Sequence, residues 1–80
     1  MIAPEELHPG DVIELSDRGI EESSIFGRAR ATRWFSVFGV DAVEGTVALI
    51  PVGLRVSTML HFSITVLAGA QRIPTASVLN

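Results

Sequence analysis

Residues 53–69 contain the pattern that most limits the fold, because two kinds of side chain alternate over almost the whole segment. One set is apolar at seven of eight positions: Leu54, Val56, Thr58, Leu60, Phe62, Ile64, Val66 and Ala68. The intervening set is apolar at only two of seven: Arg55, Ser57, Met59, His61, Ser63, Thr65 and Leu67. A period of two indicates a β-strand with one buried face and one wetter face. Because strands rarely exceed about 10 residues, we expect this one to bend, bulge or pass between sheets.

Turn sequences divide the rest of the chain into further strands. Residues 50–53 place proline second and glycine fourth, which predicts a hairpin between a strand at 46–50 and the long strand. Residues 16–19 and 41–45 predict two more turns, with strands at 11–15, from residue 20 onward and at 28–40. A helical turn at 4–7 and an extended tail from residue 73 complete the chain. The sequence therefore predicts one β-rich domain over residues 1–80, an all-β, mainly β fold built as a small five-stranded antiparallel barrel or sandwich meander.

A helix near residues 23–34 is the main structural alternative. Ser23 or Ser24 would cap its start, and Phe26, Ala29 and Trp34 follow at helical steps. Gly27 in the first turn and the lack of a clean apolar stripe argue against it. If this helix forms, the fold is α+β, with a sheet packed on one helix.

Size and composition point to association. With 80 residues, only about 60% of the unfolded surface is buried on folding, and the absence of cysteine removes disulfides and thiolate zinc ligands as reinforcement. Hydrophobic residues nevertheless make up 48% of the chain and charged residues only 19%. A monomer this small has little interior in which to bury them, which predicts a homo-oligomer or assembly on a larger protein partner.

Two further observations concern the location of the chain. The longest uncharged stretch, residues 56–71, is too short and too polar to span a bilayer. The N-terminus has neither the basic region nor the apolar region of a signal peptide. We therefore expect a cytoplasmic protein, or one carried within a macromolecular particle, with no membrane span.

Charge is divided unevenly along the chain. Residues 1–22 contain seven acids and one base, for a net charge of −6, whereas the rest of the chain is net positive. All six basic residues are arginine, which pairs with carboxylates through two parallel hydrogen bonds. This split is explained either by compositional drift or by contact between the acidic section and the arginines of a neighbouring subunit.

Arg28, Arg30, Arg33 and Trp34 form the most suggestive candidate binding site. Guanidinium groups pair with phosphates, and an indole stacks on a base, so these residues could bind a single-stranded nucleic acid. The net charge of −3 argues against this function, because nucleic-acid-binding domains are usually basic. Salt bridges of the arginines with the acidic section, and a packing role for Trp34, account for the same residues.

Catalytic and metal-binding patterns are weak. His8 and His61 are the only histidines, they lie in different segments, and no metal-ligand spacing joins them. Ser57 and Ser63 flank His61 on one strand face without an acid to orient the imidazole, and no glycine-rich phosphate motif occurs. We expect no metal site and no cofactor, and the pattern favours a protein that is not an enzyme.

These observations lead to one main hypothesis and two alternatives. The main one is a non-catalytic structural assembly protein, a small β-rich subunit that forms a homo-oligomer or decorates a larger particle such as a virion or shell. Met59, His61 and Leu67, on the wetter face of the long strand, are its candidate interface residues. The alternatives are the nucleic-acid-binding module described above and a small barrel that binds an apolar ligand oriented by His61 or Arg55.

Overall fold

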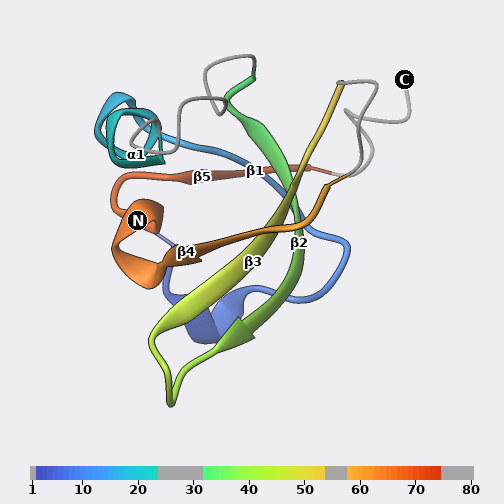
Figure 1. The fold of residues 1–80 in the computed structure, drawn as a ribbon. Helices are drawn as coiled ribbons and strands as arrows, with labels where there is room; N and C mark the ends of the chain where they lie inside the picture. The colour runs from blue at the N-terminus through green and yellow to red at the C-terminus, as the bar shows by residue number, and fades with distance from the viewer. Residues whose placement is uncertain (1, 24–31, 54–57, 75–80) are drawn as a thin grey trace.

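The computed structural model describes residues 2–23, 32–53 and 58–74 (Figure 1). Its strands form one antiparallel five-stranded sheet in the order β4-β3-β2-β1-β5. The elements are η1 (Pro4–Glu6), β1 (Val12–Glu14), α1 (Asp17–Ser23), β2 (Trp34–Asp41), β3 (Thr46–Pro51), β4 (Leu60–Ser63), η4 (Ile64–Leu67) and β5 (Gln71–Ile73), where η denotes a 3-10 helix. The fold is thus mainly β, as predicted, with one short α-helix among the described residues. The sheet is open, with β4 and β5 at its edges, so the predicted barrel or sandwich describes the five-stranded antiparallel sheet only loosely.

The central hairpin of β2 and β3 closes at the turn predicted over 41–45. Asp41 Oδ1 accepts hydrogen bonds from the backbone N–H groups of Val43, at 3.1 Å, and Glu44, at 3.0 Å. Gly45 has a φ of 70°, a left-handed conformation that glycine adopts without a steric penalty. The aspartate and the glycine together therefore fix the reversal of the chain.

A β-bulge in β2 changes which residues face the core. Before it, Val37 pairs with Leu49, and after it Gly39 pairs with Ala48, so that Phe38 is the additional residue. In a bulge, two residues of one strand oppose one residue of its partner. Phe38 is 50% exposed whereas Val37 is buried, which places the Phe38 side chain on the face opposite to that of Val37.

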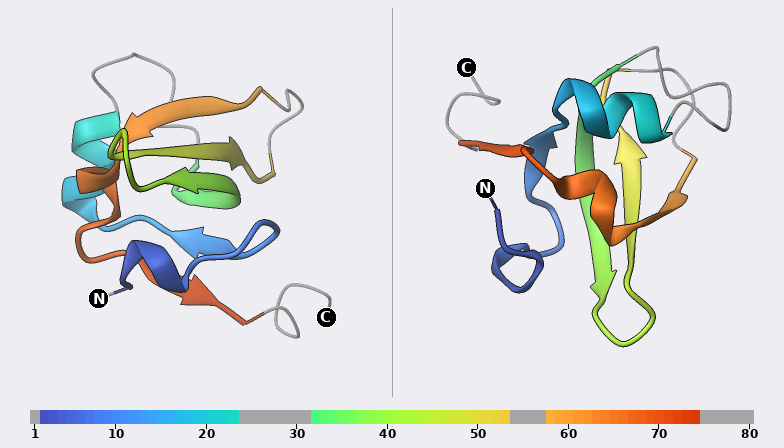
Figure 2. Two further views of the ribbon diagram at one scale, coloured as in Figure 1. Left: turned by 90° about the horizontal axis from the view of Figure 1, so that it is seen from below. Right: turned by 90° about the vertical axis from the view of Figure 1, so that its left-hand side faces the viewer.

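The hydrophobic core lies on one face of the sheet, which we call the inner face. The helices α1 and η4 lie over this face, as the right-hand view of Figure 2 shows. Phe35 of β2 and Phe62 of β4 meet edge to face, with ring centroids 6.4 Å apart and an interplanar angle of 79°. The other buried core side chains are Leu7, Ile13, Leu15, Val37, Val47, Leu49, Val66, Leu67 and Ala70.

The predicted turn at 16–19 is instead the first turn of α1, and the strand predicted from Ile20 is wrong. Ser16 precedes the helix and its Oγ accepts a hydrogen bond from Gly19 N, at 3.2 Å, which is the bond of an N-cap residue. Type I turns and helices share nearly the same backbone angles, so the same residues suit both. Packing on η4 favours the helix: a Cβ on Gly19 would lie 2.5 Å from the carbonyl oxygen of Val66. The fifth strand is β5, next to β1, at the start of the predicted tail.

The long strand predicted over 54–68 ends early. It forms β4 and then turns into η4, where Ser63 Oγ accepts a hydrogen bond from Thr65 N, at 3.4 Å. Val66 and Leu67 are both buried although they are adjacent in sequence, an arrangement that alternation along a strand does not allow. The pattern correctly placed Phe62 in the core and His61 outside it.

The hairpin predicted at 50–53 has the right partners and the wrong register. A tight turn would pair Ile50 with Gly53, whereas the structure pairs Leu49 of β3 with Leu60 of β4. Past Pro51 the chain still runs beside β2, since Val52 N donates a hydrogen bond to the carbonyl oxygen of Trp34 at 3.0 Å. The connection includes residues 54–57, which lie outside the described part of the chain.

Two further expectations concern helices. The alternative helix near 23–34 falls largely on residues 24–31, outside the described residues, and the helix that the structure does describe ends at Ser23. Within the described residues, we find no helix with the length and apolar character needed to cross a membrane.

Candidate functional site

The face of the sheet opposite to the core, which we call the outer face, presents two large aromatic side chains. Strand alternation and the bulge place Trp34, Ser36 and Phe38 of the central strand β2 on this face. Trp34 is 51% exposed and Phe38 is 50% exposed. Isolated exposed hydrophobic residues are ordinary, but two aromatic rings on the middle strand of a sheet form a patch.

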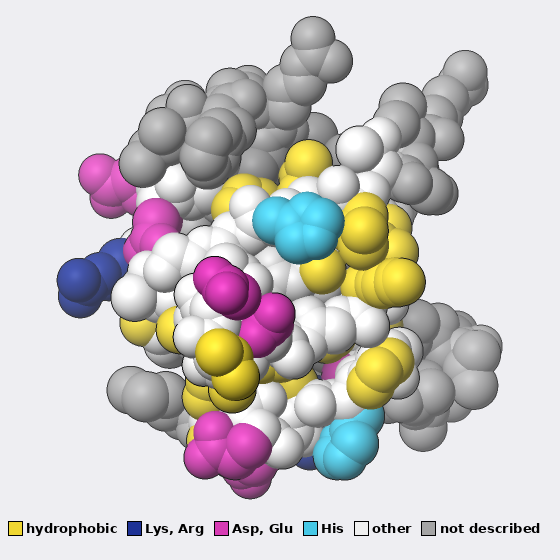
Figure 3. All heavy atoms as spheres, turned by 60° about the horizontal axis from the view of Figure 1, so that its bottom comes forward, with side chains coloured by type: hydrophobic (Ala, Val, Ile, Leu, Met, Phe, Trp, Pro, Cys, Tyr) yellow, Lys and Arg dark blue, Asp and Glu magenta, His cyan; other side chains and the backbone are white. Residues whose placement is uncertain are grey.

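Apolar side chains of the neighbouring strands extend this patch. Val12 of β1 and Ile50 of β3 both pair with Ser36, and Ile73 of β5 pairs with Val12. These three apolar residues are only partly buried and lie in one row across the sheet, in which Ser36 separates Val12 from Ile50. Figure 3 shows hydrophobic side chains gathered beside a histidine on one part of the surface and acidic side chains on another. The outer face thus carries several half-exposed or partly exposed apolar side chains.

Of the predicted interface residues Met59, His61 and Leu67, the first two are exposed and the third is buried. Met59 is 40% exposed, and His61 of β4 is exposed and pairs with Ala48. Leu67 is only 3% exposed because η4 turns its side chain into the core, so its expected position on an outer surface is wrong. Phe38 was not among the predicted site residues, although its parity with Trp34 and Ser36 in the sequence indicates that the three side chains share one strand face.

Of the four predicted nucleic-acid-binding residues, the structure describes only Arg33 and Trp34, since Arg28 and Arg30 lie outside the described residues. Arg33 Nη2 donates a hydrogen bond to Asp17 Oδ1 at 2.8 Å, with the two side chains 46% and 92% exposed. An exposed pair of this kind contributes about 0–1 kcal/mol to stability. Arg33 is therefore already next to a carboxylate of the acidic N-terminal section, in the same chain.

A second arginine also bonds within the chain. Arg72 of β5 donates to the carbonyl oxygen of Glu6 at 2.7 Å, and its Nε lies 3.7 Å from Asp11 Oδ2. The same Asp11 oxygen accepts a hydrogen bond from His8 N at 2.9 Å. These bonds hold the segment that contains η1 against the edge of the sheet, so Arg72 has a structural role.

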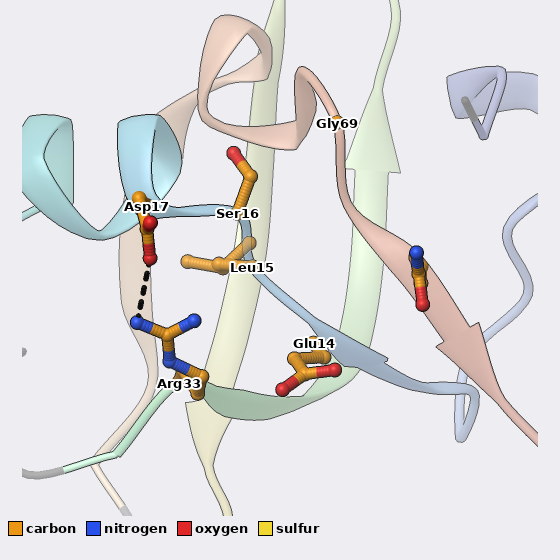
Figure 4. A pocket seen from close by; sticks show the side chains of 7 residues that line it. Glu14, Leu15, Ser16, Asp17, Arg33 and Gly69 are labelled. Carbon is orange, nitrogen blue, oxygen red and sulfur yellow. Dashed lines mark hydrogen bonds and ion pairs between the residues drawn. The ribbon is translucent and has the colours of Figure 1, made fainter.

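A polar hollow of about 270 Å³ lies where β1 meets α1 (Figure 4). Its lining includes two carboxylates, Glu14 and Asp17, and one guanidinium, Arg33, for a net charge of −1. Ser16, at its rim, donates its hydroxyl proton to the carbonyl oxygen of Ala68 at 2.7 Å. Figure 4 shows the Arg33 guanidinium turned toward Asp17, with Glu14 to the right of Arg33 in this view. The lining includes no histidine, so the hollow does not combine the Ser16 hydroxyl with the imidazole base of a serine–histidine pair.

The part of the chain that the structure describes contains no group of three or more metal-ligating side chains. A second hollow, also about 270 Å³, is lined by His61 and Asp41 together with Gly39, Val40, Thr46 and Ala48. His61 there has one carboxylate neighbour, which is short of the three protein ligands of a typical zinc site. The apolar-ligand alternative stays a prediction, since its other candidate, Arg55, lies outside the described residues.

Comparison of the chain with models of protein families, with curated proteins and with solved structures finds no match.

Proposed function

We propose that this chain is a non-catalytic assembly protein, a small β-rich subunit that associates through its outer sheet face into a homo-oligomer or onto a larger particle, in the cytoplasm or within that particle. The observation that carries the proposal is the pair of half-exposed aromatic side chains, Trp34 and Phe38, on the middle strand of the sheet. The sequence supports it independently, because a chain of this size and apolar content has little interior of its own.

The size of the outer face limits how strong the association can be. Five strands at about 4.8 Å spacing, each about 17 Å long, cover roughly 400 Å² per copy. Two such faces bury about 800 Å², less than the roughly 1,200–2,000 Å² of a standard stable interface. We therefore expect an association that depends on concentration in the micromolar range.

Sedimentation velocity over a range of concentrations tests the proposal. The test variant carries Trp34→Ser and Phe38→Ser, which remove the two aromatic rings from the outer face. The control is Val43→Ser, because Val43 is 94% exposed in the 41–45 turn, away from the outer face. We expect the wild type and the control to associate and the double variant to stay monomeric.

Circular dichroism and urea unfolding establish that the double variant is folded. A wild-type chain that is a stable monomer at high concentration argues against self-association. Equal association of the double variant and the wild type removes the outer face from the proposal.

A further inference from the structure

We infer that Trp34 and Glu14 together bind a guanidinium group, and that in the assembly this group belongs to an arginine of a second copy of the chain. Glu14 of β1 lies directly opposite Trp34 of β2 in the antiparallel ladder. Directly opposite residues share one face, with Cβ atoms about 4.5–5.5 Å apart. A half-exposed indole and a carboxylate are therefore neighbours at one end of the outer face.

Glu14 is available for this contact. Arg33, the nearest guanidinium in the hollow, makes its ion pair with Asp17, and Arg72 bonds to Glu6 and lies near Asp11. Among the described residues, no hydrogen bond or ion pair joins the Glu14 side chain to another group. Its carboxylate thus lines a hollow of about 270 Å³ in which the one guanidinium, that of Arg33, is paired with Asp17.

The chemistry of the pair selects a planar cation. A guanidinium stacks on an indole face through cation–π attraction and donates two parallel hydrogen bonds to a carboxylate. An ammonium group can make the charge contact but cannot stack as a plane. The net charge of −1 in the hollow adds to the attraction for a cation.

Charge complementarity within the sequence identifies the source of the cation. All six basic residues of the chain are arginine, and all nine acids lie in the described residues. A second copy therefore brings the guanidinium group for which the pair is suited. This step rests on the proposed function, because it requires the copies to associate.

Fluorescence tests the site by itself, because Trp34 is the only tryptophan and the chain has no tyrosine. We expect N-acetylarginine amide to change the Trp34 emission saturably in the millimolar range, and the neutral isostere N-acetylcitrulline amide to leave it unchanged. Glu14→Gln should abolish the response. Glu44→Gln, which removes the same charge from the exposed 41–45 turn, should retain it. Equal responses to the two amides, or an unaltered response in Glu14→Gln, would overturn the inference.

Sedimentation then tests the source of the guanidinium. Glu14→Gln should weaken self-association about five- to tenfold relative to the wild type and to Glu44→Gln. If the wild type associates and Glu14→Gln associates equally well, the inference fails while the proposed function stands. If the wild type is monomeric but Trp34 still responds to the arginine amide, self-association fails and a second copy is ruled out as the source. The unfolding curve of Glu14→Gln confirms that the variant is folded.

Discussion

Replacing Gly19 with alanine tests the packing of α1 on η4, which closes the inner face of the sheet. In an isolated helix this change is favourable by about 1 kcal/mol. Here the added Cβ would lie 2.5 Å from the carbonyl oxygen of Val66 and 3.4 Å from the Cβ of Leu15. The close atom belongs to the backbone, so relief requires one element to move, at the upper end of the roughly 1–3 kcal/mol typical of overpacking. We expect a net loss of about 2 kcal/mol in the free energy of unfolding.

Urea unfolding followed by Trp34 fluorescence measures this loss, with Gly39→Ala as the matched control. A Cβ on Gly39 meets nothing within 4 Å, so the control should change stability by less than about 0.5 kcal/mol. If Gly19→Ala is as stable as the wild type or more stable, the close contact between α1 and η4 is wrong.

Four further changes test the core, the helix cap and the turn after η4 by the same unfolding assay. Phe62→Ala should lower the free energy of unfolding by about 3–5 kcal/mol, because Phe62 is 6% exposed and packs on Phe35. His61→Ala, on the exposed side of β4, should lower it by less than about 1 kcal/mol. Equal losses from the two changes would contradict the faces assigned to these residues. Ser16→Ala should cost about 1–2 kcal/mol, since its hydroxyl caps α1 and bonds to the segment after η4, and an unchanged stability would argue against the cap. Gly69→Ala should destabilise the fold by more than about 1 kcal/mol, because the φ of Gly69 is +77° and the new Cβ would lie 3.1 Å from the Cβ of Ser16. An unchanged free energy of unfolding would refute that geometry.

The sequence alone predicted the structure correctly where a short residue pattern is compatible with only one local conformation. The aspartate and glycine of the 41–45 turn specify a reversal, and the apolar parity of Phe62 specifies its burial. For the outer face, the parity of Trp34 with Phe38 was present in the sequence. That parity alone did not show the bulge at Phe38, after which the alternation of inner and outer residues along β2 shifts by one residue.

The prediction failed where the same short residue pattern is compatible with two different local conformations. Ser16 and Gly19 suit both a type I turn and the first turn of a helix, and the decision depends on the distant Val66 backbone. The consecutive apolar residues Val66 and Leu67 broke the alternation and could have indicated the change from strand to η4. The pairing of Glu14 with Trp34 required the register of β1 on β2, which a single strand does not contain.

The emission of Trp34 as a function of protein concentration tests the central claim most directly, since the only indole of the chain lies on the proposed contact surface. The indole is 51% exposed in the monomer, so association through the outer face should remove it from water. We predict a shift of its emission to shorter wavelength as the concentration rises through the micromolar range, in step with the increase in sedimenting mass. An emission spectrum that stays constant while the mass increases would place the contact elsewhere on the molecule.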